Sequence, residues 1–198
     1  MTKVLIAFYS RTGSTEALAK AIAEGARAAG AEVRLRRARE VVPAEVMAKA
    51  PGWAEAAERM NALYEAPTAE DALWADAIIL GSPSRFGVVC SELKAWIDGL
   101  GGLWAGGKLV GKVGSAFSAS SVLHGGNEMV IQSQWVSLAH LGLIIVPTGY
   151  ADPVMFQAGT PYGATAATGQ GRALTDAEVA AANWQGRRVT QVAKALRG

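Results

Sequence analysis

Residues 3–15, KVLIAFYSRTGST, join an apolar run to a short turn that is rich in hydroxyl groups. The run from Lys3 to Tyr9 is continuously apolar after its first residue, which is typical of a strand that helices cover on both faces. The turn carries four Ser or Thr side chains in six residues, and beyond it apolar residues recur at helical spacing. This order of strand, turn and helix predicts the first unit of an α/β protein with a parallel sheet.

Four more apolar runs follow, separated by segments long enough to hold helices. The predicted strands after the first span Glu32 to Arg36, Ala77 to Gly81, Val110 to Phe117 and Gly142 to Val146. The predicted helices span Thr15 to Ala29, Glu92 to Leu100 and Glu128 to Leu141. A last helix opens with a capping box at Thr175 and Glu178. The runs at 77 and 142 are continuous, which predicts strands buried on both faces. The run at 32 alternates with arginines, which predicts an edge strand. We therefore expect a doubly wound parallel sheet of five strands with helices on both faces.

Length and composition predict one folded domain over residues 1–198. The chain is 51% hydrophobic and 18% charged, so it can bury a full core and lacks the composition of a disordered protein. Two stretches exceed a minimal α/β unit. Residues 40–71 contain three prolines and predict an excursion with one short helix near Ala54 to Asn61. Residues 150–173 are rich in Gly, Ala and Thr, as a functional or disordered loop of that length would be.

Composition also argues against several functions. The apolar runs are far shorter than the roughly 20 residues of a membrane span, and none resembles a signal peptide. A net charge of +2 does not require nucleic acid or anionic lipid as a partner. Cys90 has no second cysteine to pair with, and with only His124 and His140 beside it the chain lacks an obvious metal-ligand set. We expect a cytoplasmic location and a Cys90 that is a buried small apolar residue.

The turn Ser10-Arg11-Thr12-Gly13-Ser14-Thr15 predicts a site for a terminal monophosphate. A helix N-terminus offers unpaired backbone N–H groups and the positive end of the helix dipole. The hydroxyl groups add donors, and Gly13 permits a tight turn. The turn lacks the Gly-Lys-Ser/Thr of a Walker A loop and the Gly-x-Gly-x-x-Gly of a dinucleotide fingerprint. The alternative is an ordinary Ser or Thr helix cap, which needs only one hydroxyl.

The run Ser10-x-Thr12-Gly13-x-Thr15 resembles the FMN-phosphate loop of flavodoxin-like proteins. Residues 81–87 (GSPSRFG), 101–105 (GGLWA) and 159–165 (GTPYGAT) resemble the WrbA-type NAD(P)H:quinone oxidoreductases, and the likeness spans nearly the whole chain. The resemblance implies a flavodoxin-like sheet with strand order 2-1-3-4-5. It also implies FMN as cofactor, a homotetramer, and two-electron reduction of quinones by NADH or NADPH. We expect a ping-pong cycle with hydride transfer through flavin N5.

In such a sheet the ligand lies at the carboxyl ends of the strands, so the loops after the third and fourth strands are expected to hold the flavin. The expected contacts are Pro83, Ser84, Arg85, Phe86 and Gly87 in the first loop, and Ser118, Ala119, Ser120, Ser121 and Gly125 in the second. A plain strand-to-helix turn is the alternative for the first loop. In the second loop, Val122-Leu123-His124 departs from the family's Gly/Thr pattern.

Trp104 and His140 are the expected catalytic residues. Trp104 matches the family's tryptophan in Gly-Gly-Leu-Trp, which lines the active site across the tetramer interface. His140 matches a family position beside the flavin, which implies a cofactor contact and a proton-donor role. The alternatives are a packing or interfacial tryptophan and a structural histidine, with the quinone protons coming from water.

The charges of the expected flavin loops favour two-electron chemistry. Residues 82–89 and 118–126 contain no Asp or Glu, and Arg85 lies in the first of these segments. Carboxylates near the ring would disfavour the anionic reduced flavin by Coulomb repulsion. Two other functions stay open: a flavodoxin-type one-electron carrier, for which the chain shows no acidic cluster, and a non-enzymatic FMN-binding regulatory protein, for which it shows no DNA-binding motif.

The preference for NADH or NADPH also stays open. Family members often carry an aromatic residue where this chain has Thr12, a position that the resemblance places beside the nicotinamide. Arg34, Arg36, Arg37 and Arg39 could hold a 2′-phosphate. We favour the interpretation that they are solvated charges on an edge strand.

Overall fold

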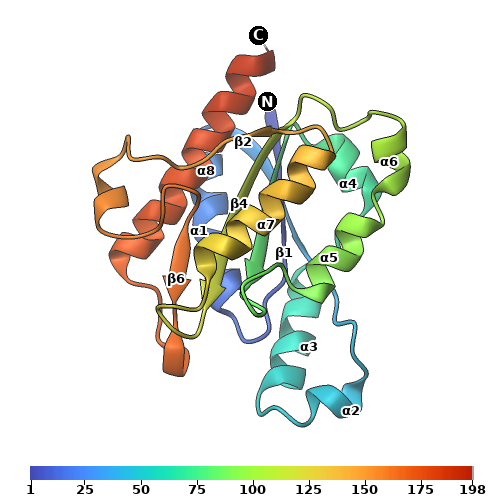
Figure 1. The fold of residues 1–198 in the computed structure, drawn as a ribbon, viewed down its shortest axis with the longest axis vertical. Helices are drawn as coiled ribbons and strands as arrows, with labels where there is room; N and C mark the ends of the chain where they lie inside the picture. Colours follow the sequence, from blue (N-terminus) through green and yellow to red (C-terminus); the bar gives the residue numbers. More distant parts are fainter. Residues whose placement is uncertain (198) are drawn as a thin grey trace.

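A central parallel sheet organises the computed structural model, which describes residues 1–197 (Figure 1). Its strands are β1 (Thr2–Phe8), β2 (Ala31–Arg37), β3 (Ala77–Pro83), β4 (Val113–Ser120), β5 (Ile144–Ile145) and β6 (Thr165–Ala167). The order is β2-β1-β3-β4-β5 with β6 also paired to β4, and the pairings between these strands are parallel. The predicted α/β fold and its strand order are confirmed.

Helices cover both faces of this sheet (Figure 1). Helices α1 (Ser14–Ala28) and α8 (Asp176–Arg197) pack on one face, and α4 (Ala69–Trp74), α5 (Ser91–Asp98) and α7 (Asn127–His140) pack on the other. Alternate residues of β1 point to opposite sides and are buried on both, as the continuous apolar run predicts. Among residues 1–197, no helix combines the length and apolar composition needed to cross a membrane.

The two helices on the first face approach each other closely. Gly25 in α1 and Gly186 in α8 lie at the contact, where a Cβ at either position would sit 2.0 Å from a backbone oxygen of the other helix. Helix α8 begins at the predicted capping box, in which the Glu178 N–H donates to Thr175 Oγ1 at 3.2 Å and the Thr175 N–H donates to the Glu178 carboxylate at 2.8 Å. The cap and the paired glycines fix α8 against α1.

Two short strands share the fifth position of the sheet. β5 pairs with Val113 and Gly114 at the start of β4, whereas β6 pairs with Ser118 to Ser120 at its end. The segment between β5 and β6 leaves the sheet and contains the 3-10 turn η1 (Pro153–Phe156). Because β6 lies beside the carboxyl end of β4, the stretch 150–173 contributes to the edge of the sheet where ligands bind in folds of this type.

Two strand predictions need correction. The run from Gly142 to Val146 forms strand only at β5, and Ile144 is 45% exposed, so the prediction of a strand buried on both faces is wrong. The reason is that β5 lies at the end of the sheet and leaves it after two residues. The fourth strand begins at Val113 rather than Val110, because residues 106–111 form turns in which Val110 is exposed.

The excursion at residues 40–71 forms α2 (Ala44–Met47), α3 (Trp53–Leu63) and the start of α4. Helix α3 confirms the short helix predicted near Ala54 to Asn61. Both α2 and α3 lie beyond the carboxyl ends of the strands, at the bottom of Figure 1.

The edge position of β2 is confirmed, but its arginines are not solvated charges as predicted. Arg37 is fully buried and paired with Glu40. Arg34 and Arg36 both pair with Asp71 of α4, at 2.9 and 3.0 Å. The prediction is wrong because the excursion and α4 bring carboxylates to this strand, which pattern analysis of the strand alone does not reveal.

Candidate functional site

The turn at residues 10–15 leaves β1 and leads directly into α1. Gly13 has a φ of 114°, in the left-handed region that favours glycine, and its N–H donates to Ser10 Oγ at 3.0 Å. Within residues 1–197, no side chain caps the start of α1. The first backbone N–H groups of the helix therefore stay available to a ligand. These donors and the helix dipole fit a phosphate group.

A cavity of about 270 Å³ opens beside this turn. Its lining residues are Ser10, Arg11, Thr12, Ser14, Thr15, Ala50, Pro51, Pro83, Ser84, Arg85, Ala119, Ser120, Ser121 and Thr168. The lining contains two arginines and no carboxylate, so its charge complements an anionic ligand. The structure thus brings together residues from all three loops that the sequence predicts to hold the flavin.

The loop after β3 is held against the loop after β4. The Ser84 N–H donates to the Ala119 carbonyl at 2.8 Å, and Ser84 Oγ donates to the Gly125 carbonyl at 2.5 Å. Phe86 has a φ of 53° and is wholly exposed, and it does not line the cavity. A left-handed phenylalanine is a strained conformation of the kind found at ligand sites. Gly87 and Gly125, which were also expected to contact the flavin, do not line the cavity either.

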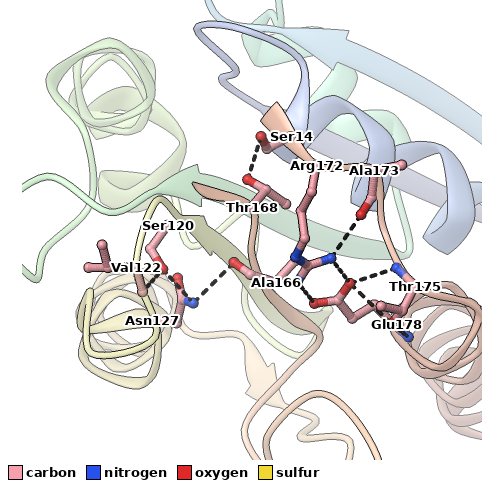
Figure 2. Close-up of polar contacts among 10 residues, drawn as sticks. All are labelled: Ser14, Ser120, Val122, Asn127, Ala166, Thr168, Arg172, Ala173, Thr175 and Glu178. Carbon is pink, nitrogen blue, oxygen red and sulfur yellow. Dashed lines mark hydrogen bonds and ion pairs between the residues drawn. The ribbon is translucent and has the colours of Figure 1, made fainter. Parts of the chain in front are cut away.

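Asn127, which was not among the predicted site residues, connects the loop after β4 to β6 (Figure 2). Its Nδ2 donates to Ser120 Oγ at 3.0 Å and to the Ala166 carbonyl at 3.3 Å, and its Oδ1 accepts from Ser118 Oγ at 2.9 Å. Ser118 is therefore buried behind the cavity rather than in its lining. Asn127 positions Ser120, which does line the cavity.

Thr168 follows β6 and lines the cavity on the side of the turn at residues 10–15. Its hydroxyl donates to Ser14 Oγ at 2.7 Å, as Figure 2 shows. A second cavity of about 320 Å³ lies behind this bond and is lined by Thr12, Gly13 and Arg172, among others. Arg172 is paired with Glu178 at 2.6 Å, so its charge is already compensated.

Trp104 and His140 lie together but far from this cavity. They line a separate hollow of about 310 Å³ between α5, α6 (Gly101–Ala105) and the end of α7. Helix α7 runs antiparallel to the strands, so Asn127 at its start lies at the carboxyl end of the sheet and His140 at the opposite end (Figure 1). Within one chain, the structure does not bring Trp104 or His140 to the predicted flavin loops.

The excursion supplies the part of the cavity wall that sequence analysis misses. Ala50 and Pro51 line the cavity, and the guanidinium of Arg11 lies over the ring of Trp53, 3.9 Å from its centroid. The three prolines of this excursion mark it as a loop, but no periodic pattern indicates where the loop folds back. Ala50, Pro51 and Trp53 could not be predicted as site residues, because only tertiary contacts bring them to the cavity and the turn.

Glu16 and Cys90 are buried ionisable groups whose pKa values shift on folding. Burial of Glu16 opposes its ionisation, but hydrogen bonds from Arg59, Lys20 and Tyr64 outweigh this and lower its pKa to about 2. Burial raises the pKa of the Cys90 thiol to about 11, and Cys90 is fully buried beside β3, which confirms its prediction as a small core residue.

Comparison with known proteins bears on the chemistry of the cavity. The model of the NADPH-dependent FMN reductases matches residues 3–154 of the chain. The chain belongs to this family. Membership of the NADPH-dependent FMN reductase family makes it a flavin oxidoreductase with FMN as its flavin.

Individual relatives are similar to this chain over nearly its whole length. A protein of Deinococcus radiodurans named NAD(P)H dehydrogenase (quinone) is 41% identical over 197 residues, which cover 99% of this chain and 98% of that protein. A WrbA-like flavodoxin protein from Agrobacterium tumefaciens superposes with a TM-score of 0.68 at 22% identity, covering 98% of this chain and 99% of that one. Oxidised flavodoxin 2 from Bacillus cereus superposes with a TM-score of 0.58 at 19% identity, covering 99% and 98%. These comparisons confirm the flavodoxin-like fold and the resemblance to the WrbA-type quinone oxidoreductases.

Proposed function

We propose that this protein reduces quinones by two electrons at the expense of NAD(P)H, with FMN bound in the cavity at the carboxyl end of the sheet. FMN, when bound, would supply the redox chemistry, a ping-pong transfer of a hydride from NAD(P)H to the quinone through flavin N5. The observation that carries the proposal is a cavity with an uncapped helix start at one end, Arg85 in its wall and no carboxylate in its lining.

The turn at residues 10–15, called the phosphate turn from here on, binds the cofactor in this proposal. The hydroxyl groups of Ser10, Thr12, Ser14 and Thr15 and the free N–H groups of α1 donate to the phosphate. Thr168 supports the turn through its bond to Ser14.

The loops after β3 and β4 hold the ring. Pro83, Ser84, Ala119 and Ser121 offer backbone groups and small side chains that leave room beside the ring for a substrate. The Arg85 cation stabilises negative charge at the ring, which favours full reduction over a one-electron state.

A second copy of the chain completes the substrate slot, because Trp104 and His140 cannot reach the cavity of their own chain. Trp104 is 59% exposed, and His140 is exposed beside it. Both are therefore free to meet another protomer, which supports the homotetramer that the resemblance implies. Trp104 forms an aromatic wall in that arrangement, and His140 contacts the flavin and donates a proton. We also place the enzyme in the cytoplasm, where its lone buried thiol stays reduced.

Steady-state kinetics test this proposal. The FMN-loaded protein is assayed with NADH and separately with NADPH, each at several fixed concentrations of benzoquinone. Parallel double-reciprocal lines are the expected result, because the two substrates use one slot in turn. Intersecting lines would exclude the ping-pong order. If neither NADH nor NADPH supported reduction of the quinone, the proposed activity would be excluded.

A further inference from the structure

Arg37, the last residue of β2, is completely buried beneath the phosphate turn. Its Nη2 donates to the carbonyl oxygen of Ser10 at 3.0 Å. Its Nη1 donates to Asn61 Oδ1 of α3 at 2.6 Å, and the guanidinium also pairs with the carboxylate of Glu40. One side chain therefore connects the first residue of the turn to the excursion that follows β2.

The excursion touches the turn at two more places. Arg59 and Tyr64 donate to Glu16 in the first turn of α1, with Arg59 Nη1 at 3.1 Å and the Tyr64 hydroxyl at 2.9 Å from Oε1. Arg11 of the turn lies over the Trp53 ring of α3. Residues 37–64 therefore contact Ser10 at the start of the turn, the side chain of Arg11, and Glu16 in the helix that follows the turn.

The contact with Ser10 fixes the direction of a neighbouring donor. The peptide bond between Ser10 and Arg11 is trans and planar, so its C=O and N–H point in opposite directions. Because Arg37 holds the Ser10 carbonyl towards the protein interior, the Arg11 N–H is turned away from the interior. Arg11 lines the cavity, so an N–H that points away from the interior would be available to a ligand there.

We propose that Arg37 is a positioning residue for the turn at residues 10–15, and that its contact with the Ser10 carbonyl sets the affinity for FMN by orienting the peptide between Ser10 and Arg11. This inference rests on the proposed binding of FMN in the cavity. Arg37 acts through the backbone of the turn and does not touch the cofactor. Its charge is compensated by Glu40, so orientation rather than net charge is its contribution.

A merely structural arginine would affect every ligand of the protein equally, and this difference makes the inference testable. Riboflavin carries the same ring as FMN but no phosphate. Loss of the Ser10 contact should weaken FMN binding and leave riboflavin binding almost unchanged. Loss of overall stability should weaken the binding of both flavins.

The experiment measures the dissociation constants of FMN and riboflavin for the apoprotein, from the quenching of flavin fluorescence, in the wild type and in Arg37→Met. The methionine keeps apolar packing and removes the donors. We expect FMN binding to weaken about tenfold or more, as for the loss of a buried charge-assisted hydrogen bond, and riboflavin binding to stay within about twofold, too small to count as an energetic effect.

Arg39→Met is the matched control. Arg39 donates to the same Asn61 Oδ1 at 2.5 Å and to the Tyr64 carbonyl at 2.8 Å but does not contact Ser10. We expect it to leave the affinities for both flavins unchanged. Arg37→Lys is the second variant, for use if Arg37→Met does not fold: it keeps the charge, but a single ammonium cannot replace the fork that reaches Ser10, Asn61 and Glu40. It should show the same selective loss, to a smaller extent.

Equal weakening of both flavins, or unchanged FMN binding in a folded Arg37 variant, would overturn the inference. A wild-type protein that binds neither flavin would overturn the proposed cofactor site as well. A wild type that binds FMN tightly, with variants that show no selective loss, would overturn the role of Arg37 alone.

Discussion

Thr15 and Ser10 are the two buried hydroxyl-bearing residues of the turn at residues 10–15, and both line the cavity. Thr15 is the second residue of α1, next to the free N–H groups of the first helical turn. We predict that Thr15→Ala weakens FMN binding by about 1–3 kcal/mol, the range for a hydrogen bond to a charged group. A fluorescence titration of the apoprotein measures this. Thr15→Ser retains the hydroxyl and should bind FMN like the wild type, whereas unchanged affinity in the alanine variant would refute the role of Thr15.

The residues of the phosphate turn could be predicted from sequence because the motif is contiguous. Ser10 to Thr15 follow one strand and precede one helix, so their local chemistry defines the site. Thr168 and Asn127 could not be predicted in the same way, because their roles depend on tertiary contacts. Thr168 contacts Ser14 at the other end of the chain, and Asn127 joins Ser118 and Ser120 of β4 to Ala166 of β6. Phe86 matches the family motif, yet its ring projects into solvent in the isolated chain.

At the scale of elements, Glu16 links α1 to the excursion through Arg59 and Tyr64, and it also pairs with Lys20 of its own helix. Its pKa falls from 4.5 to about 2 on folding, so the ionised carboxylate stabilises the folded state. A lowered folded-state pKa gives stability that is complete above the unfolded pKa and is lost as the pH falls through the folded pKa. The loss should therefore occur between about pH 4.5 and pH 2.

Denaturant unfolding of Glu16→Gln against the wild type at several pH values measures this link. We expect the wild type to be the more stable at pH 6 and the difference to shrink as the pH is lowered towards 2. Glu24→Gln, an exposed position on the same helix, is the matched control for the loss of one carboxylate. A Glu16 difference that does not change with pH would contradict the prediction.

The contact between α1 and α8 makes a second prediction at this scale. In Gly186→Ala the new Cβ would lie 2.0 Å from the Ile22 carbonyl oxygen, so the helices must separate. We expect the free energy of unfolding to fall by about 1–3 kcal/mol, as for other overpacked cores. Gly101→Ala is the control, because a Cβ there meets no atom within 4 Å. Equal stability of Gly186→Ala and the wild type would show that α8 moves without cost.

The main strands and helices could be predicted because each carries its own period. The runs at β1 and β3 are continuous, and α1 and α8 have helical spacing with recognisable ends. β6 could not be predicted, since Thr165-Ala166-Ala167 has no apolar run and becomes a strand only by pairing with β4. The pairing of Arg34 and Arg36 with Asp71 likewise depends on the tertiary placement of α4.

For the whole molecule, the cavity at one end of the sheet is separated from Trp104 and His140 at the other. Only the family resemblance assigns these two residues to the active site, and no local pattern states which copy supplies them. The separation explains why Trp104 is exposed in a single chain. It also makes the proposed enzyme dependent on assembly.

Trp104→Ala tests this dependence. Its loss should raise the Michaelis constants for NAD(P)H and quinone about tenfold, the size expected for a lost aromatic contact. The FMN dissociation constant should stay unchanged, because Trp104 lies far from the cavity of its own chain. Trp104→Phe keeps an aromatic wall and should retain most of the activity. Weakened FMN binding with normal Michaelis constants would contradict this role.

The central claim is that FMN in this cavity carries two electrons between small molecules. The most direct test is an anaerobic titration of the FMN-loaded protein with NADH, and separately with NADPH. The flavin absorbance is followed during the titration, and benzoquinone is then added. The account predicts complete bleaching without a stable one-electron state, followed by immediate return of the absorbance with quinone. Failure of both nucleotides to bleach the flavin, together with a stable one-electron state on chemical reduction, would contradict it and identify an electron carrier.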